Sequence, residues 1–392
     1  MRRGTFQWMK SVNKSLILNK IRTDAPISRA EIAKQTKLTP PTVSSNVKEL
    51  IEQGLVIESE LGQSKGGRKP TMLLINHKSF YVIGVDAGPQ TIVCVLSDLA
   101  GNIRERVTKP LHESITNDEF LGILKDCIQT ILNESSISSM EKIIGIGVAM
   151  HGVVDVEAGL SLFAPNLSLK NIPIKEVLEN EFDLEVKVEN DARAMALGEA
   201  WFGDHGELHH MLALNIGRGV GAGLVVNRQL FHGAQDIAGE VGHMTIELDG
   251  ERCECGNRGC LQTFVSGPAI GKIATRTLAT HDKREITGED VYQMALAGNK
   301  KCIEILERTG EIIGIGLTNL IHVINPEKII IGGGVTKSKQ FILPVIQETI
   351  EKRALTPSAK QTEVVISSLG DDATVLGAVS LLLVDLFNPV TI

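Results

Sequence analysis

The sequence has no apolar run of 18 or more residues, which excludes a membrane-spanning helix of ordinary length. Its basic start, MRRGTFQWMKSVNK, is followed by neither an apolar signal core nor a cleavage site of small residues. Cysteine is scarce, with six among 392 residues. We therefore expect a cytoplasmic protein with no membrane partner, whose thiols stay reduced and available to a metal ion.

The composition is ordinary for a globular protein, with 43% hydrophobic and 22% charged residues. A chain of 392 residues can form two or three domains with substantial cores. The net charge of −7 is unevenly distributed: residues 1–78 carry 14 Lys and Arg against 6 Asp and Glu, and the remainder carries 26 against 41. A basic N-terminal segment on an acidic body indicates nucleic-acid binding by one end, with a chance imbalance as the alternative.

The basic segment has the pattern of a helix-turn-helix. A first helix, over residues 10–23, is predicted to bury one stripe of apolar side chains: Val12, Leu16, Ile17 and Ile21. Ser28 and Glu31 form a capping box that opens a second helix. Thr39 can cap a third helix that has Pro40 at its first position.

The third helix is the predicted recognition helix. Its polar side chains suit base edges and phosphates: Thr42, Ser44, Ser45, Asn46 and Lys48. Residues 55–59 and 71–75 are predicted strands around the basic tip GQSKGGRKP, so we expect a winged helix-turn-helix domain over residues 1–78. The tip would reach phosphates or a minor groove with Lys65, Arg68 and Lys69. A small helical domain that binds protein is the alternative.

Three of the six cysteines, Cys253, Cys255 and Cys260, lie within eight residues, and His243 lies ten residues before the first. Three thiolates and one imidazole complete a tetrahedral zinc shell with no position left for water, which is typical of a structural site. Buried or disulfide-bonded cysteines are the alternative, but crowding within one loop favours metal. We predict a structural Zn²⁺ ion in the loop formed by residues 240–266.

The same stretch resembles the signature of the ROK family, which contains sugar repressors, open reading frames and sugar kinases. The resemblance rests on E-x-G-H at residues 240–243 and C-x-C-G-x-x-G-C at residues 253–260. It implies that the histidine and the three cysteines bind zinc, that Glu240 contacts a sugar hydroxyl and that His243 also faces the sugar. The family usually has a sugar-binding Glu two residues after the last cysteine. Here that residue is Gln262, which is neutral and can donate a hydrogen bond.

From residue 80 the pattern changes to strands that alternate with helices. Three strands in hairpin succession and the buried strand IIGIGVAM lead the first half, and a second series beginning at MLALNIG repeats the arrangement. Two such units predict a duplicated ribonuclease-H-like domain of the actin and hexokinase type, with two lobes, over residues 79–392. The resemblance to the ROK family implies the same fold, with a cleft between the lobes.

The resemblance also implies sugar-contact positions in the first lobe. These are Gly152, whose backbone can approach a ligand closely, Asn166 in APNL, and Asn190 and Asp191 in END. In ROK kinases the position of Asp191 belongs to the general base that takes a proton from the sugar hydroxyl. A helix cap is the alternative role of Asn190 and Asp191. Amides, carboxylates and an imidazole fit a polyol, because each hydroxyl both donates and accepts, so we expect a monosaccharide ligand.

The phosphate-binding loops depart from those of ROK kinases. The family's D-x-G-G-T-K appears here as DAGPQT at residues 86–91, which removes backbone flexibility and one donor. The loop IGRGVGAG has Arg218 where kinases usually have Thr. We therefore expect a sugar to be bound and not phosphorylated, with no catalytic residue. A sugar kinase with an accessory DNA-binding domain is the alternative.

The combined prediction is a sugar-responsive repressor that binds double-stranded operator DNA and a monosaccharide effector. Two-fold symmetry of a homodimer, or of a homotetramer built from dimers, would match a pseudo-palindromic operator. The S-R-A helix start, the T-V-S-S recognition helix and the GQSKGGRKP wing are most similar to those of xylose repressors. That similarity makes xylose the predicted inducer.

Overall fold

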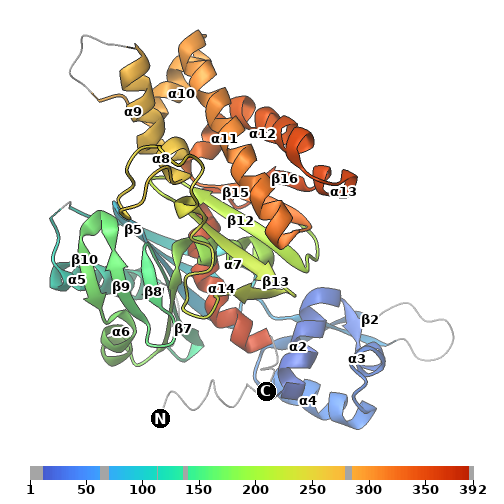
Figure 1. Cartoon of the computed structure of the whole chain (residues 1–392). Helices are drawn as coiled ribbons and strands as arrows, with labels where there is room; N and C mark the ends of the chain where they lie inside the picture. The colour runs from blue at the N-terminus through green and yellow to red at the C-terminus, as the bar shows by residue number, and fades with distance from the viewer. Residues whose placement is uncertain (1–11, 62–69, 113, 136–139, 279–284, 388–392) are drawn as a thin grey trace. The chain divides into compact units, whose positions relative to one another are not determined.

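The computed structural model describes residues 12–61, 70–112, 114–135, 140–278 and 285–387. The described residues form two compact units, one within Met1–Asp191 and Ala378–Ile392, the other within Ala192–Gly377 (Figure 1). No helix in these ranges is long and apolar enough to cross a membrane.

The N-terminal segment of the first unit is a winged helix-turn-helix. Its elements are α2 (Val12–Asp24), β1 (Ile27–Ser28), α3 (Arg29–Thr36), α4 (Pro40–Glu52), β2 (Val56–Leu61) and β3 (Thr71–Ile75). The three strands pair antiparallel in the order β1-β3-β2. The predicted helices and the two wing strands are confirmed, and the short strand β1 was not predicted.

The predicted caps are confirmed. The Ser28 hydroxyl accepts a hydrogen bond from the backbone N–H of Glu31, and the Glu31 carboxylate accepts one from the backbone N–H of Ser28. The Thr39 side chain accepts from the backbone N–H of Thr42 at the start of α4, where Pro40 occupies the first position. Both helices therefore begin where their N-terminal N–H groups find side-chain acceptors.

The predicted apolar stripe of α2 is wrong in part. Val12 is 51% exposed, and Leu16 is half-buried. The buried face includes Leu18 and the alkyl stem of Lys14 instead. The Lys14 ammonium lies 2.7 Å from the Glu49 carboxylate on α4, so the stem is buried while its charge is paired.

Each unit contains one five-stranded mixed sheet, and the two sheets have the same topology. The first is built from β4 (Tyr81–Ala87), β5 (Thr91–Asp98), β6 (Ile103–Pro110), β7 (Ile143–Met150) and β11 (Glu185–Asn190). The second is built from β12 (His210–Ile216), β13 (Val220–Val226), β14 (Gln229–Phe231), β15 (Lys328–Gly332) and β16 (Glu363–Ile366). Across each sheet the neighbouring strands are, by their order in the chain, the third, second, first, fourth and fifth. The first three strands pair antiparallel, and the fourth and fifth pair parallel to the first and to each other. This repeat confirms the predicted duplicated fold.

Helices surround the sheets. The main ones are α5 (Asn117–Glu134), α6 (Ile174–Phe182), α7 (Asp191–Phe202), α9 (Gly267–Leu278), α10 (Gly288–Leu296), α11 (Lys300–Ile324), α12 (Lys339–Arg353) and α14 (Ala373–Phe387). Figure 1 shows α11 and α12 side by side in the second unit. Short helices are α8 (Gln262–Val265) and α13 (Pro357–Lys360), with 3₁₀ turns η1 (Met140–Lys142), η2 (Pro165–Leu167), η3 (Val241–His243), η4 (Gly334–Ser338) and η5 (Gly370–Asp372).

A small antiparallel sheet in the first unit was not predicted. It consists of β8 (Val153–Asp155), β9 (Leu160–Ala164) and β10 (Leu169–Ile172), in the order β10-β9-β8. The turn η2 connects β9 to β10 and carries Asn166. The small sheet therefore positions one of the predicted sugar contacts.

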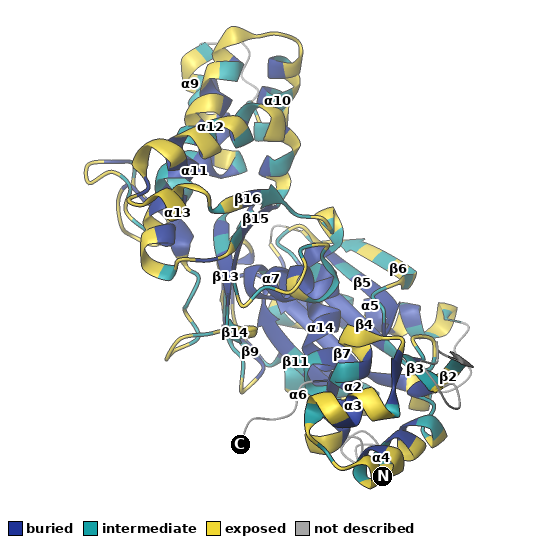
Figure 2. Cartoon of the chain, turned by 90° about the vertical axis from the view of Figure 1, so that its right-hand side faces the viewer, coloured by how far each residue is buried: buried dark blue, intermediate teal, exposed yellow. Residues whose placement is uncertain are grey.

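The cores lie around the central strands, which are coloured as buried in Figure 2. All eight residues of β7 are buried, as predicted for the run IIGIGVAM. Parallel strands covered on both faces have such continuous apolar runs. The predicted site residues Gly152, Asn190 and Asp191 therefore lie at or just after the ends of these strands.

Candidate functional site

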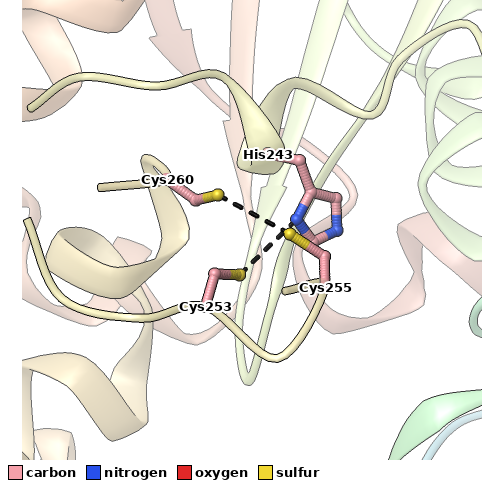
Figure 3. Close-up of side chains that lie close together, drawn as sticks. All are labelled: His243, Cys253, Cys255 and Cys260. Carbon is pink, nitrogen blue, oxygen red and sulfur yellow. Dashed lines mark hydrogen bonds between the residues drawn. The ribbon is translucent and has the colours of Figure 1, made fainter. Parts of the chain in front are cut away.

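Four side chains of the second unit form a cluster that could hold a metal ion. The ligand atoms of His243, Cys253, Cys255 and Cys260 all lie within 4.8 Å of one another (Figure 3). Cys253 Sγ is 3.7 Å from His243 Nδ1, and Cys255 Sγ is 3.7 Å from Cys260 Sγ. The three cysteines and the one histidine predicted as metal ligands are therefore brought together.

Backbone hydrogen bonds bring these ligands together from distant positions. The Leu261 N–H donates to Met244 O at 2.8 Å, which joins the His243 segment to the Cys260 segment. Within the loop, the Cys253 N–H donates to Asn257 O at 2.8 Å. Gly259 has a φ of +64°, and a Cβ there would lie 1.6 Å from Glu247 O. Only glycine allows this approach, so the turn before Cys260 depends on it.

The environments of the thiols differ. Burial, reinforced by the neighbouring Cys253 and Cys255 sulfurs, raises the pKa of Cys260 to about 12. Cys255 is exposed, and a backbone hydrogen bond from Asn257 lowers its pKa. A metal ion binds thiolates, so its binding must displace the proton of Cys260.

Glu240 and Gln262 border this cluster. His243 Nε2, on the opposite side of the ring from the sulfur contact, lies 3.9 Å from Glu240 Oε2. Gln262 Nε2 donates to Cys253 Sγ at 3.3 Å. A hydrogen bond to a ligand atom, as from Gln262 to Cys253, orients that atom for a metal ion. Of the three sugar-contact positions predicted in the second unit, His243 belongs to the metal cluster, and Glu240 and Gln262 lie beside it.

The sugar-contact positions predicted in the first unit lie where strands end. Asn190 ends β11 beside Met150, the last residue of the parallel strand β7. The Asn190 amide nitrogen donates to Gly152 O at 2.9 Å and to Asp191 Oδ1 at 3.0 Å. These bonds hold the Asp191 carboxylate beside the turn after β7, so Asn190 positions its neighbours.

Gly152 permits the close packing of this turn. Its φ is +90°, and a Cβ would lie 2.2 Å from Phe163 O and 2.9 Å from Pro165 Cδ. The turn after β7 therefore lies against the end of β9, immediately before Asn166. Asn166 itself is exposed. Gly152, Asn166, Asn190 and Asp191 consequently belong to one neighbourhood of the first unit.

Asp86, near the end of β4, adds a second carboxyl group to this neighbourhood. Part of its side chain contacts solvent, but protein surrounds it on most sides. This burial, with a smaller contribution from the negative charge of Asp191, raises the pKa of Asp86 to about 7. The following loop is closed by a hydrogen bond from the Gly88 N–H to Thr91 O at 3.1 Å.

Helix α4 has one buried apolar face and one exposed polar face. Val43, Val47 and Leu50 are buried against the rest of the winged helix, whereas Ser44, Ser45 and Lys48 are exposed. Thr42 and Asn46 are half-buried, and the Asn46 amide donates to Thr42 O at 2.8 Å. The Lys48 ammonium lies 3.8 Å from the Glu52 carboxylate. Because this ion pair is exposed, it restrains the Lys48 side chain only weakly. Lys65, Arg68 and Lys69 lie outside the described residues.

Known proteins match the chain in both of its parts. Residues 82–384 match the ROK family, and residues 13–57 match the winged helix-turn-helix DNA-binding family. The chain belongs to the ROK family. The xylose repressor of Caldicellulosiruptor bescii is 33% identical over 394 residues, which cover 98% of each chain.

Two further proteins match almost the whole chain. The DNA-binding transcriptional dual regulator NagC of Escherichia coli K12 is 30% identical over 383 residues, covering 96% of this chain and 94% of NagC. A crystal structure described as a ROK family transcriptional regulator, a homologue of the E. coli MLC protein, superposes with a TM-score of 0.83. It is 27% identical and covers 96% of this chain and 97% of its own. These similarities extend over the whole chain, including the winged helix.

Two buried residues of this ROK chain were not predicted as functional. The Arg193 side chain, 1% exposed, extends from α7 and its Nη1 donates to Asp236 O at 2.5 Å, in the loop before Glu240. His151 follows β7 and is 4% exposed. The signal for Arg193 was a single cation among small apolar residues in DARAMALGEA, and the signal for His151 was a polar residue ending a fully apolar strand.

Proposed function

We propose that this chain is a sugar-responsive, DNA-binding transcriptional repressor of carbohydrate-utilisation genes that works in the cytoplasm. The observation that carries the proposal is the recognition helix α4, with Ser44, Ser45 and Lys48 exposed, in the same chain as a ROK domain. Similarity over almost the whole chain to proteins named as repressors supports it. Residues 1–78 would bind DNA, and residues 79–392 would bind the effector.

The proposed DNA interface is α4 in a major groove. The exposed Ser44, Ser45 and Lys48 would contact base edges or phosphates, with Thr42 and Asn46 at the margin. The wing residues Lys65, Arg68 and Lys69 remain proposed phosphate or minor-groove contacts. A homodimer, or a homotetramer of dimers, would place two recognition helices on half-sites ~34–36 Å apart.

The proposed effector is a monosaccharide. The proposed sugar contacts are the positions predicted from the sequence: Gly152, Asn166, Asn190, Asp191, Glu240, His243 and Gln262. Carboxylates, amides and an imidazole supply the mixture of donors and acceptors that sugar hydroxyls require. The similarity to the xylose repressor of C. bescii makes D-xylose the first sugar to test. The 30% identity to the N-acetylglucosamine repressor of Escherichia coli O6:H1 makes N-acetyl-D-glucosamine the second.

The proposed metal is a structural Zn²⁺ ion. Four ligands at the usual Zn–S distance of ~2.3 Å form a tetrahedron with edges of ~3.8 Å. Two pairs of ligand atoms in the cluster are 3.7 Å apart, close to that edge, and all pairs lie within 4.8 Å. His243, Cys253, Cys255 and Cys260 would hold the ion, which would supply structural cross-linking of the loop. Glu240 and Gln262 would then have fixed positions.

We propose that the chain does not phosphorylate its sugar. Pro89 has no N–H to offer a phosphate, and the Gln90 side chain replaces the family's Thr in the first phosphate loop. Asp191, the family's general-base position, would act only as a hydrogen-bond acceptor. The second candidate, a ROK sugar kinase with an accessory DNA-binding domain, rests on this retained Asp191. A coupled ATP-hydrolysis assay with D-xylose, D-glucose and N-acetyl-D-glucosamine separates the two, because turnover would favour the kinase.

The proposal is tested by the Asp191→Ala variant in operator-binding titrations. Sugar and DNA must affect each other's affinity by the same factor, and a hundredfold effect needs a coupling of only ~2.7 kcal/mol. We expect Asp191→Ala to bind operator like the wild-type protein but to ignore the sugar. A variant that responds to sugar normally would remove Asp191 from the effector site. Loss of operator binding by the folded variant would indicate that sugar acts as a corepressor.

A further inference from the structure

We propose that His151 is a further effector contact, with its Nε2 atom as the acceptor for a hydroxyl of the bound sugar. The inference rests on the proposed effector function and adds a specificity-determining residue to it. His151 follows β7 directly, one residue before Gly152. It was absent from the sugar contacts predicted from the sequence.

The orientation of the His151 ring is fixed from one side. His151 Nδ1 lies 3.0 Å from Ala87 O, at the end of β4. A carbonyl oxygen only accepts hydrogen bonds, so Nδ1 must carry the hydrogen and donate it. In the neutral ring the second nitrogen, Nε2, then has a lone pair and no hydrogen. The backbone contact with Ala87 therefore makes Nε2 a hydrogen-bond acceptor.

This acceptor lacks a donor within the described part of the protein. The His151 side chain is 4% exposed, and Nε2 is buried with no hydrogen-bond partner among the described residues. Buried polar atoms in folded proteins nearly always have a partner. An unpartnered acceptor therefore marks the position of a bound hydrogen-bond donor, supplied by either water or a ligand.

The position of His151 favours the ligand. β4, β7 and β11 are neighbouring parallel strands, and their carboxyl ends carry Asp86, His151 and Asp191 respectively. Ligands of sheets of this kind bind outside the carboxyl ends of the strands. The next residue, Gly152, accepts a hydrogen bond from the Asn190 amide that also holds Asp191. His151 is thus part of the same neighbourhood as the proposed effector ligands of the first unit.

The chemistry gives His151 a definite selectivity. A neutral imidazole nitrogen accepts from an O–H group and gains nothing from an ether, a carbonyl or a C–F group. Sites built to hydrogen-bond a hydroxyl discriminate strongly against analogues that lack it, because the buried partner is then left unpaired. His151 should therefore select for one hydroxyl of the effector.

The decisive variant is His151→Asn. Its side-chain amide can still donate to Ala87 O from near the Nδ1 position, but it has no atom at the Nε2 position. With D-xylose as the titrant, followed by N-acetyl-D-glucosamine and D-glucose, calorimetry should show binding weakened about tenfold, the usual effect of one lost hydrogen bond. The matched control is His112→Asn, the same change at an exposed position of the same unit, which should bind like the wild-type protein.

Fluorinated sugars locate the hydroxyl. Each hydroxyl of the best-binding sugar is replaced in turn by fluorine, and the wild-type protein and His151→Asn are titrated with every analogue. One replacement should weaken wild-type binding about tenfold and leave His151→Asn unaffected, because the partner has already been removed. If every replacement has the same effect on both proteins, Nε2 does not contact the sugar and the inference is wrong.

The remaining outcomes separate this inference from the function on which it rests. If none of the three sugars binds the wild-type protein, the proposed effector function and the role of His151 both fail. If the wild-type protein and His151→Asn bind equally tightly, only the role of His151 fails, and Nε2 serves a buried water. Should His151→Asn unfold early, His151→Gln, which restores an acceptor near the Nε2 position, must bind within about threefold of the wild-type protein. Equal loss of binding and thermal stability in both variants would leave His151 a purely structural role.

Discussion

Asp86→Asn should stabilise the protein at alkaline pH more than at acidic pH. Burial and the charge of Asp191 raise the pKa of Asp86 to about 7 from an ordinary value of 3.8. The folded protein therefore holds this proton more tightly than the unfolded chain does. As the pH rises from ~4 to ~7, Asp86 loses its proton in the unfolded chain before it does so in the folded protein. Its destabilising contribution to the free energy of unfolding therefore grows up to pH ~7 and stays constant above that pH. Asparagine does not ionise and abolishes this pH dependence.

The magnitude follows from the two pKa values. At ~1.36 kcal/mol per pKa unit, the full penalty in the free energy of unfolding would be ~1.5 kcal/mol at pH 5 and ~4 kcal/mol at pH 8. Because part of the Asp86 side chain contacts solvent, we expect about half of this difference. The advantage of Asp86→Asn should therefore grow by ~1–1.5 kcal/mol between pH 5 and pH 8.

Thermal unfolding at a series of pH values measures the effect. For units of this size, 1 kcal/mol corresponds to ~2–4 °C in Tm, so the Tm difference between Asp86→Asn and wild type should widen by ~3–5 °C. Asp118→Asn makes the same change at an exposed position and should give a smaller and flatter difference. A constant difference for Asp86→Asn would show that Asp86 is already ionised at pH 5 and that burial does not control it.

Three other substitutions test separate parts of the structure. Elemental analysis should show that Cys255→Ser loses stoichiometric zinc, whereas Cys302→Ala, which changes a buried cysteine outside the cluster, retains it. If the wild-type protein purified under reducing conditions contains no zinc, the proposed metal site is wrong. Gly152→Ala should lower the free energy of unfolding by ~2–4 kcal/mol, because the added Cβ would lie 2.2 Å from Phe163 O. The control Gly54→Ala, with a similar φ of +78° but no atom within 4 Å of its Cβ, should lower it by only ~1–2 kcal/mol. Equal losses would refute the packing argument. Lys48→Ala should reduce the slope of log affinity for operator against log salt concentration by ~0.9, and an unchanged slope would mean that Lys48 contacts no phosphate.

Local sequence patterns predicted the elements whose structure is determined locally. The capping box of Ser28 and Glu31 and the Thr39 cap involve residues three positions apart, so their spacing alone identifies the helix starts. The cluster of potential metal ligands could also be predicted from the sequence, because three of its four residues lie in one short loop. The duplicated sheets followed from the repeated order of strands and helices.

Features that depend on tertiary packing were not predicted. The buried face of α2 includes the Lys14 stem because Glu49 on α4 pairs its charge, and that partner lies 35 residues away. The sheet formed by β8, β9 and β10 consists of strands of three to five residues, which are too short for a clear alternation. Arg193 donates to Asp236 O, 43 residues away along the chain, and no local pattern connects these two residues.

The central claim is that one chain couples sugar binding to operator binding, and fluorescence anisotropy with a labelled operator tests it most directly. The operator is first selected from genomic fragments with the wild-type protein, and its affinity is then measured at fixed salt with and without saturating D-xylose or N-acetyl-D-glucosamine. The account predicts that one of these sugars weakens operator binding by a factor of about 5–150, the usual range of such coupling, while the Asp191→Ala variant shows no change. Specific operator binding that no sugar alters, although calorimetry shows that the sugar binds, would contradict it.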